Sequence, residues 1–126
     1  MDGAYDVLIE GAGPAGLGAA LRLQQLGYRV ILVERSAVWP RKQIGEVLTP
    51  GVRNILDLLD ANDALDGVPH LSGQPSLVLW RASEPENVPH GGAAMVDRAG
   101  FDAALLALAR RRGIEVALPA RVRALD

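Results

Sequence analysis

Hydrophobic and polar residues follow one another along this chain in blocks that are typical of an α/β protein. An apolar run over residues 5–10 predicts a strand, and apolar positions at helical spacing predict a helix over residues 14–26. A second, nearly continuous apolar run over residues 29–34 predicts a parallel strand covered on both faces. We expect the buried face of the first helix to carry Ala15, Ala19, Leu23 and Leu26. The chain should therefore begin with a βαβ unit.

The rest of the chain predicts a less regular succession of elements. We expect helices over 50–60 and 98–112, strands over 76–81, 93–96, 114–118 and 121–125, and loops over 36–45, 61–75 and 82–90. Thr49 and Asp97 should act as the N-caps of the two helices. The core positions of these helices should be Val52, Ile55, Leu56 and Leu59 in the first, and Phe101, Ala104, Leu105 and Leu108 in the second.

The turn between the first strand and the first helix carries a glycine motif. It is a Gly-x-Gly-x-x-Gly pattern formed by Gly11, Gly13 and Gly16, with Pro14 and Ala15 between the last two glycines. The first glycine allows a tight turn, the second a close approach to a pyrophosphate, and the third close packing of helix on strand. Glu34 ends the second strand, at a spacing where a carboxylate binds a ribose hydroxyl. The pattern predicts a dinucleotide-binding site.

The segment after the second strand favours one class of dinucleotide over another. We expect strand 114–118 to lie beside strand 29–34, which makes residues 36–94 a large insertion between the second and third strands of the sheet. A plain nicotinamide-binding domain proceeds directly to its next βα unit, so the insertion favours a flavin. Two alternatives remain open at this point: an NAD(P)-binding dehydrogenase domain, and a non-catalytic module that binds a nucleotide.

Composition restricts the remaining classes. The 126 residues suffice for one domain, and 13 basic against 15 acidic residues give a net charge of −2, which argues against nucleic acid as a partner. There is no cysteine, so disulfides and thiolate chemistry are excluded. No apolar stretch reaches the length of a membrane span, and the acidic N-terminus is unlike a signal peptide, so we expect no membrane association and a cytoplasmic location. His70 and His90 stand alone, and we expect no metal site.

Three segments together resemble a known group of enzymes. The first is the glycine motif with the preceding Asp6-Val7-Leu8-Ile9, the second is residues 40–50 with Gly45-Glu46, and the third is Val96-Asp97-Arg98 with Phe101-Asp102. They are similar to segments of FAD-dependent monooxygenases of the hydroxybenzoate-hydroxylase type and of tryptophan-halogenase-like flavoproteins. The resemblance implies a Rossmann-like FAD-binding fold over residues 1–126. It also implies the N-terminal part of a flavin-dependent oxidoreductase, a monooxygenase or a halogenase-like enzyme, whose substrate domain is absent.

The resemblance further implies a role for each residue of the site. The pyrophosphate of FAD would contact the turn, formed by Gly11, Gly13, Pro14, Ala15 and Gly16. On the adenosine side, Glu34 would bind the ribose, Arg35 would lie near the adenine, and the backbone of Val122 would contact the adenine edge. Arg41 would bind a phosphate or the ribityl chain, Gly45 and Glu46 would lie on the isoalloxazine side, and Arg98 would lie close to the cofactor. No residue suggests itself as catalytic. Further candidate partners are NAD(P)H as electron donor and a C-terminal half or protein partner that completes the enzyme.

Three features depart from the pattern of these families: Glu10, the position of the lysine, and Val47, which stands in place of the serine of a Gly-Glu-Ser motif. Glu10 stands before Gly11, where the families have a small or apolar residue, and a carboxylate buried beside a pyrophosphate is costly unless it is paired or protonated. The halogenases also carry a catalytic lysine after the helix that follows Gly45-Glu46. Lys42, the sole lysine here, precedes that helix, which disfavours halogenation.

Overall fold

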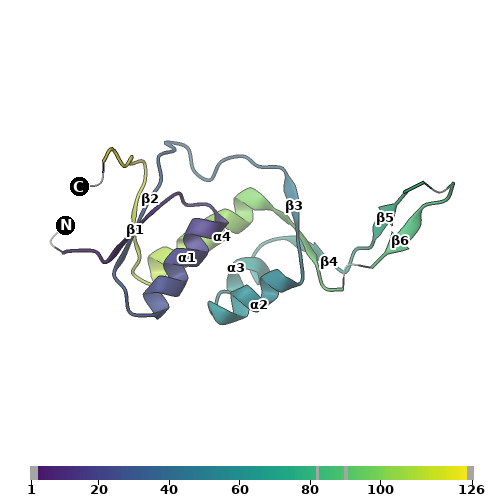
Figure 1. The fold of residues 1–126 in the computed structure, drawn as a ribbon, viewed down its shortest axis with the longest axis horizontal. Helices are drawn as coiled ribbons and strands as arrows, with labels where there is room; N and C mark the ends of the chain where they lie inside the picture. Colours follow the sequence, from purple (N-terminus) through teal and green to yellow (C-terminus); the bar gives the residue numbers. More distant parts are fainter. Residues whose placement is uncertain (1–2, 82, 90, 125–126) are drawn as a thin grey trace.

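The part of the molecule that carries the glycine motif is a parallel sheet packed against helices (Figure 1). The computed structural model describes residues 3–81, 83–89 and 91–124. Strand β1 (Val7–Glu10), helix α1 (Pro14–Gln25) and strand β2 (Val30–Val33) form a βαβ unit in which β1 and β2 pair in parallel. Strand β8 (Glu115–Ala117) pairs in parallel with the other edge of β2, giving the order β1-β2-β8. The predicted α/β class and its parallel sheet are confirmed.

The segment between β2 and β8 forms a second layer of structure. Strands β3 (Gly45–Leu48), β4 (His70–Ser72) and β7 (Ala94–Asp97) make an antiparallel sheet in the order β3-β7-β4. Helices α2 (Gly51–Leu58), α3 (Asp63–Asp66) and α4 (Arg98–Arg111) accompany it. Strands β5 (Ser76–Val78) and β6 (Glu86–Val88) form a two-stranded ribbon far from α1 in Figure 1. The interpretation of this segment as an insertion stays a prediction.

Several predicted boundaries were wrong. Strands β4 and β6 and helix α3 lie in segments that we expected to be loops, and β3 lies at the end of the expected loop 36–45 and in residues for which we expected no element, because these elements are too short to carry a strong apolar period. Strand β5 ends at Val78, earlier than predicted. Residues 121–124 form no strand, and residue 125 lies outside the described residues, as do residues 82 and 90 of the expected loop.

Helix α1 buries a different face from the predicted one. Its buried residues are Leu17, Ala20 and Leu21. Ala15 and Ala19 are exposed and Leu26 is 57% exposed, whereas Leu23 is partly buried against the core. The reason is the position of α2, since Ala15 and Ala19 face that helix across a pocket and do not pack against the sheet.

The other two long helices follow their predictions more closely. In α4, Phe101, Leu105 and Leu108 are buried and Ala104 packs at the edge of the core. Asp97 caps α4 as predicted, because its side chain accepts a hydrogen bond of 3.2 Å from the backbone N–H of Ala99.

Helix α2 differs from its prediction at one core position and at its first residue. Leu56 and Leu59 are buried and Val52 is partly buried, but Ile55 is 56% exposed and lines the pocket opposite α1. The helix begins at Gly51, after Pro50, whose dihedral angles are already helical.

Arg112, directly after α4, ties the ends of the helices together. Its Nη1 donates a hydrogen bond of 2.5 Å to the carbonyl oxygen of Leu59, at the end of α2. Its own carbonyl oxygen accepts a hydrogen bond of 3.3 Å from Nε2 of Gln24 in α1. None of the helices in the described part of the chain has the length and apolar character that crossing a bilayer requires.

The close packing of α1 on β1 depends on Gly16. A Cβ atom there would lie 2.0 Å from the carbonyl oxygen of Gly11, whereas a Cβ at Gly13 would meet no atom within 4 Å. We expect Gly16→Ala to lower the free energy of unfolding by about 1–3 kcal/mol through overpacking. Gly13→Ala should change it by no more than about 0.5 kcal/mol. Urea unfolding of both variants is the measurement, and equal stabilities would contradict the role of Gly16.

Candidate functional site

The turn between β1 and α1 has the geometry that its glycines predict. Gly11 has φ +104°, in the left-handed region that favours glycine, and its N–H donates a hydrogen bond of 2.7 Å to the carbonyl oxygen of Val33 in β2. Gly13 is the N-cap of α1 and Pro14 is in its first turn. The first bond of the helix runs from the N–H of Leu17 to the carbonyl of Gly13, at 2.9 Å. The N–H groups that precede Leu17 are therefore at the positive end of the helix.

Glu34 clamps this turn to the end of β2. The residue is only 6% exposed, and its two carboxylate oxygens accept hydrogen bonds from two backbone N–H groups. Oε2 accepts from Ala12 at 2.9 Å, and Oε1 accepts from Ser36 at 2.8 Å. The two carboxylate oxygens have four acceptor positions between them, so a further donor such as a hydroxyl can still bind.

The charge of Glu34 is stabilised in the fold. Burial alone would raise the pKa of this carboxyl. The N–H groups of Ala12 and Ser36, the Ser36 hydroxyl and the positive charge of Arg41 outweigh burial and hold the pKa below its ordinary value of 4.5. Glu34 is therefore an ionised acceptor at neutral pH.

A pocket of about 400 Å³ lies where β1 and β2 end, and we call it the polar pocket. It is lined by Glu10, Gly11, Glu34, Arg35 and Arg41, so four predicted site residues come together here. Glu10 is exposed, and the expected cost of a carboxylate buried beside the turn does not arise. The reason is the strand alternation, which turns Ile9 toward the core and Glu10 away from it.

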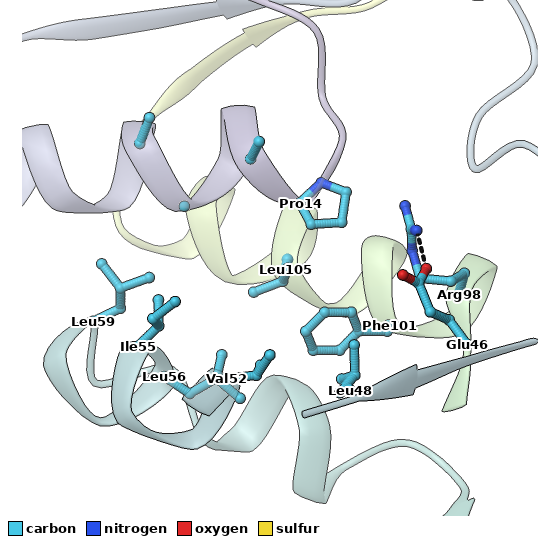
Figure 2. A pocket seen from close by; sticks show the side chains of 13 residues that line it. Pro14, Glu46, Leu48, Val52, Ile55, Leu56, Leu59, Arg98, Phe101 and Leu105 are labelled. Carbon is cyan, nitrogen blue, oxygen red and sulfur yellow. Dashed lines mark hydrogen bonds and ion pairs between the residues drawn. The ribbon is translucent and has the colours of Figure 1, made fainter. Parts of the chain in front are cut away.

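A second pocket of about 430 Å³ lies on the other side of the turn, between α1, α2 and α4 (Figure 2). We call it the apolar pocket, because most of its wall is formed by aliphatic residues and Phe101. Pro14 and Ala15 line it at the start of α1, and Glu46 and Arg98 are its charged residues. The glycine turn thus adjoins both pockets, through Gly11 on one side and Pro14 on the other.

Arg98 is the centre of an ion cluster at the apolar pocket. Its Nε and Nη2 donate hydrogen bonds of 3.1 and 3.2 Å to the two oxygens of Asp102, one turn further along α4. Its Nη1 donates to Glu46 of β3. The hydrogen bonds to Asp102 first, and then to Glu46, raise the pKa of the Arg98 guanidinium above its ordinary value. Arg98 is therefore a permanent cation with a fixed orientation.

Not every predicted site residue joins these groups. Gly45 begins β3 and lines a separate small pocket with Val47 and Met95. Val122 does not line the polar pocket, although the N–H of Ala120, two residues earlier, donates a hydrogen bond of 2.8 Å to the carbonyl of Glu34. His70 lies apart from the site, and its Nδ1 is 2.9 Å from the carbonyl oxygen of Val68. His90 lies outside the described residues.

Sequence reasoning assigned no role to two residues that shape the site. Asp102 is 2% exposed and binds Arg98, and the spacing of four residues on a helix is the signal that predicts such a pair. Ser36 donates its backbone N–H to Glu34, and no side-chain pattern indicates a backbone donor.

Comparison with known proteins identifies the class of this domain. The family model described as FAD binding domain matches residues 4–124. The tryptophan 2-halogenase of Chondromyces crocatus is 35% identical over 116 residues, which are 87% of this chain and 22% of that protein. The flavoprotein/dehydrogenase of Cytophaga hutchinsonii superposes with a TM-score of 0.83 at 29% identity, covering 96% of this chain and 32% of that one.

A third relative is the flavin-dependent halogenase CmlS, whose structure superposes with a TM-score of 0.79 at 34% identity, over 92% of this chain and 22% of that one. The chain belongs to the FAD binding domain family, the N-terminal domain type of flavin-dependent monooxygenases and halogenases, and its cofactor is FAD. The comparisons give no support to the nicotinamide alternative. The chain spans about a fifth to a third of the length of these relatives.

The clamp formed by Glu34 predicts a dependence of stability on pH. Because the folded pKa lies below 4.5, the stabilisation is complete above that value and is lost as the pH falls through the folded pKa. We expect the unfolding free energy of the wild type to exceed that of Glu34→Gln at pH 7, and the difference to shrink in acid. Urea unfolding of both proteins from pH 7 to pH 3 measures this. A difference that stays constant with pH would contradict the clamp.

Proposed function

We propose that this domain binds the ADP half of FAD across the glycine turn and serves a flavin-dependent oxidoreductase of the monooxygenase or halogenase-like class. The observation that carries the proposal is the hydrogen bond between Glu34 and the N–H of Ala12. It brings a buried, ionised carboxylate directly beside the turn, so that a ribose at the carboxylate places its phosphate at the start of α1.

The residues present fit this ligand. Glu34 keeps an acceptor position for a ribose hydroxyl, and the polar pocket is lined by two residues with guanidinium groups, Arg35 and Arg41, for the adenine side and a phosphate. The space that a Cβ at Gly13 would occupy is open, which lets a pyrophosphate approach the backbone.

Roles on the flavin side rest on fewer contacts. Glu46 and Arg98 lie together on the side of the turn opposite the polar pocket, beside the start of α1, which supports their assignment to the pyrophosphate and to the part of the cofactor beyond it. The proposed contacts of Gly45 with the isoalloxazine side and of the Val122 backbone with the adenine edge rest on the family resemblance alone. FAD supplies the redox chemistry when it is bound, and the residues of this chain bind and orient it.

The remaining parts of the enzyme are also proposals. The chain spans 22% to 32% of the length of these relatives, so most of their length lies outside the matched part. We propose that a C-terminal part or a protein partner supplies the region that holds the substrate, and that NAD(P)H is the electron donor. The cytoplasmic location proposed from the sequence is compatible with these partners.

Binding of FAD and its fragments tests the proposal. We expect FAD and ADP to bind, measured by calorimetry, and riboflavin, which lacks the ADP half, to bind far more weakly. Gly13→Ala should weaken FAD binding by at least about tenfold, because its methyl group enters the space of the pyrophosphate. Gly51→Ala, a glycine of α2 that lines neither pocket, is the matched control and should bind as the wild type does.

Two results would refute the assignment of the ADP half to the turn. One is equal FAD affinity in the wild type and in Gly13→Ala, provided that both are folded by circular dichroism. The other is binding of riboflavin as tight as that of FAD, which would place the binding energy on the flavin end.

A further inference from the structure

The ion cluster around Arg98 contains one carboxylate more than the charge of the arginine requires. Asp102 of α4 and Glu46 of β3 both bind the same guanidinium. Two carboxylates and one guanidinium give the cluster a net negative charge. The cluster lies next to the start of α1, where the proposed function places a pyrophosphate. A site for an anionic group should not carry a surplus negative charge, since like charges repel each other.

The first carboxylate is fixed. The Asp102 side chain is 3% exposed and receives two hydrogen bonds from Arg98, through Nε and Nη2. Separation of the pair would leave a buried charge without a partner, which is strongly unfavourable. Asp102 therefore holds two of the three guanidinium nitrogens and leaves Nη1 to face another group.

The second carboxylate is exchangeable. The Glu46 side chain is 50% exposed, it contacts Nη1 of Arg98, and it stands on β3, an edge strand of its sheet. Ion pairs that remain open to water contribute little, because both groups are well solvated when apart. Release of Glu46 into solvent therefore costs little, whereas release of Asp102 does not.

Arg98 and the start of α1 line the same pocket. Figure 2 shows Arg98 rising from α4 toward the level of Pro14, with Glu46 reaching it from β3. Pro14, Ala15, Glu46 and Arg98 line the same pocket. An anion bound at the start of α1 would therefore share this pocket with the Arg98 guanidinium.

We infer that Glu46 occupies the position on Arg98 that a phosphate group takes when the nucleotide binds, and that binding exchanges this carboxylate for the phosphate. The ligand in this inference rests on the proposed function. Asp102 is a positioning residue that keeps Arg98 aimed at the pocket. Glu46 competes with the ligand and sets its affinity, and it acts on phosphate-bearing ligands only.

Calorimetry with ADP and adenosine tests the exchange. Glu46→Gln removes the competing charge, and we expect it to bind ADP about fivefold more tightly than the wild type and adenosine equally well. Glu86→Gln removes the same charge from an exposed position of β6 and is the matched control, with no expected change. Unchanged or weaker ADP binding in Glu46→Gln would overturn the inference, as would an equal gain for adenosine.

Inorganic pyrophosphate separates this inference from the proposed function. If neither FAD nor ADP binds the wild type, the proposed function fails. A pyrophosphate affinity that still rises in Glu46→Gln then supports the exchange, and one that does not rise overturns it. Should Glu46→Gln reduce the folded fraction seen by circular dichroism, Glu46→Thr, which suits a strand, replaces it in the same titrations.

Discussion

The carboxylate of Glu34 is the interaction on which the nucleotide end of this structure depends. It accepts hydrogen bonds from the N–H groups of Ala12, inside the glycine turn, and of Ser36, beyond β2, and so links the loops that follow β1 and β2. Burial of such a charge is unfavourable unless donors surround it, and here backbone groups supply them. The same side chain therefore shapes the turn and presents the remaining acceptors to a ligand.

The glycine turn lies between two pockets, one lined by charged groups and the other mostly by apolar side chains. On one side, charged groups of both signs surround the polar pocket, which suits a ligand that carries hydroxyls and phosphates. On the other side, aliphatic residues of α1 and α2 face one another across the apolar pocket. Arg112 explains how α2 stays in place although α1 does not pack tightly against it, since it ties the end of α2 to α4 and α1. In the described part of the chain, Arg112 thus links α1 and α2 at their C-terminal ends.

The parts of the structure that sequence could predict are those with strong local signals. The run Val30–Val33 and the glycines around Pro14 determine the βαβ unit, and Asp97 determines the start of α4. Strands β3 and β6 escaped prediction because their exposed residues show no alternation. The proximity of Gly11 and Glu34 follows from a local motif, whereas their role in binding a nucleotide stays a prediction. The Arg98 cluster needed the tertiary structure, since the register of β3 against β7 decides that Glu46 reaches α4. The buried face of α1 was misjudged because apolar residues also line pockets.

The ribbon of β5 and β6 exposes apolar side chains that can promote self-association of the chain. Leu77 is 70% exposed, and Leu79 and Trp80, directly after β5, are 63% and 76% exposed. A two-stranded ribbon is only marginally stable in water, and its unpaired edges can template pairing with another copy. Apolar side chains at such an edge favour self-association. We therefore expect this ribbon to favour aggregation when the purified chain is concentrated, independently of how well the domain folds or holds its cofactor.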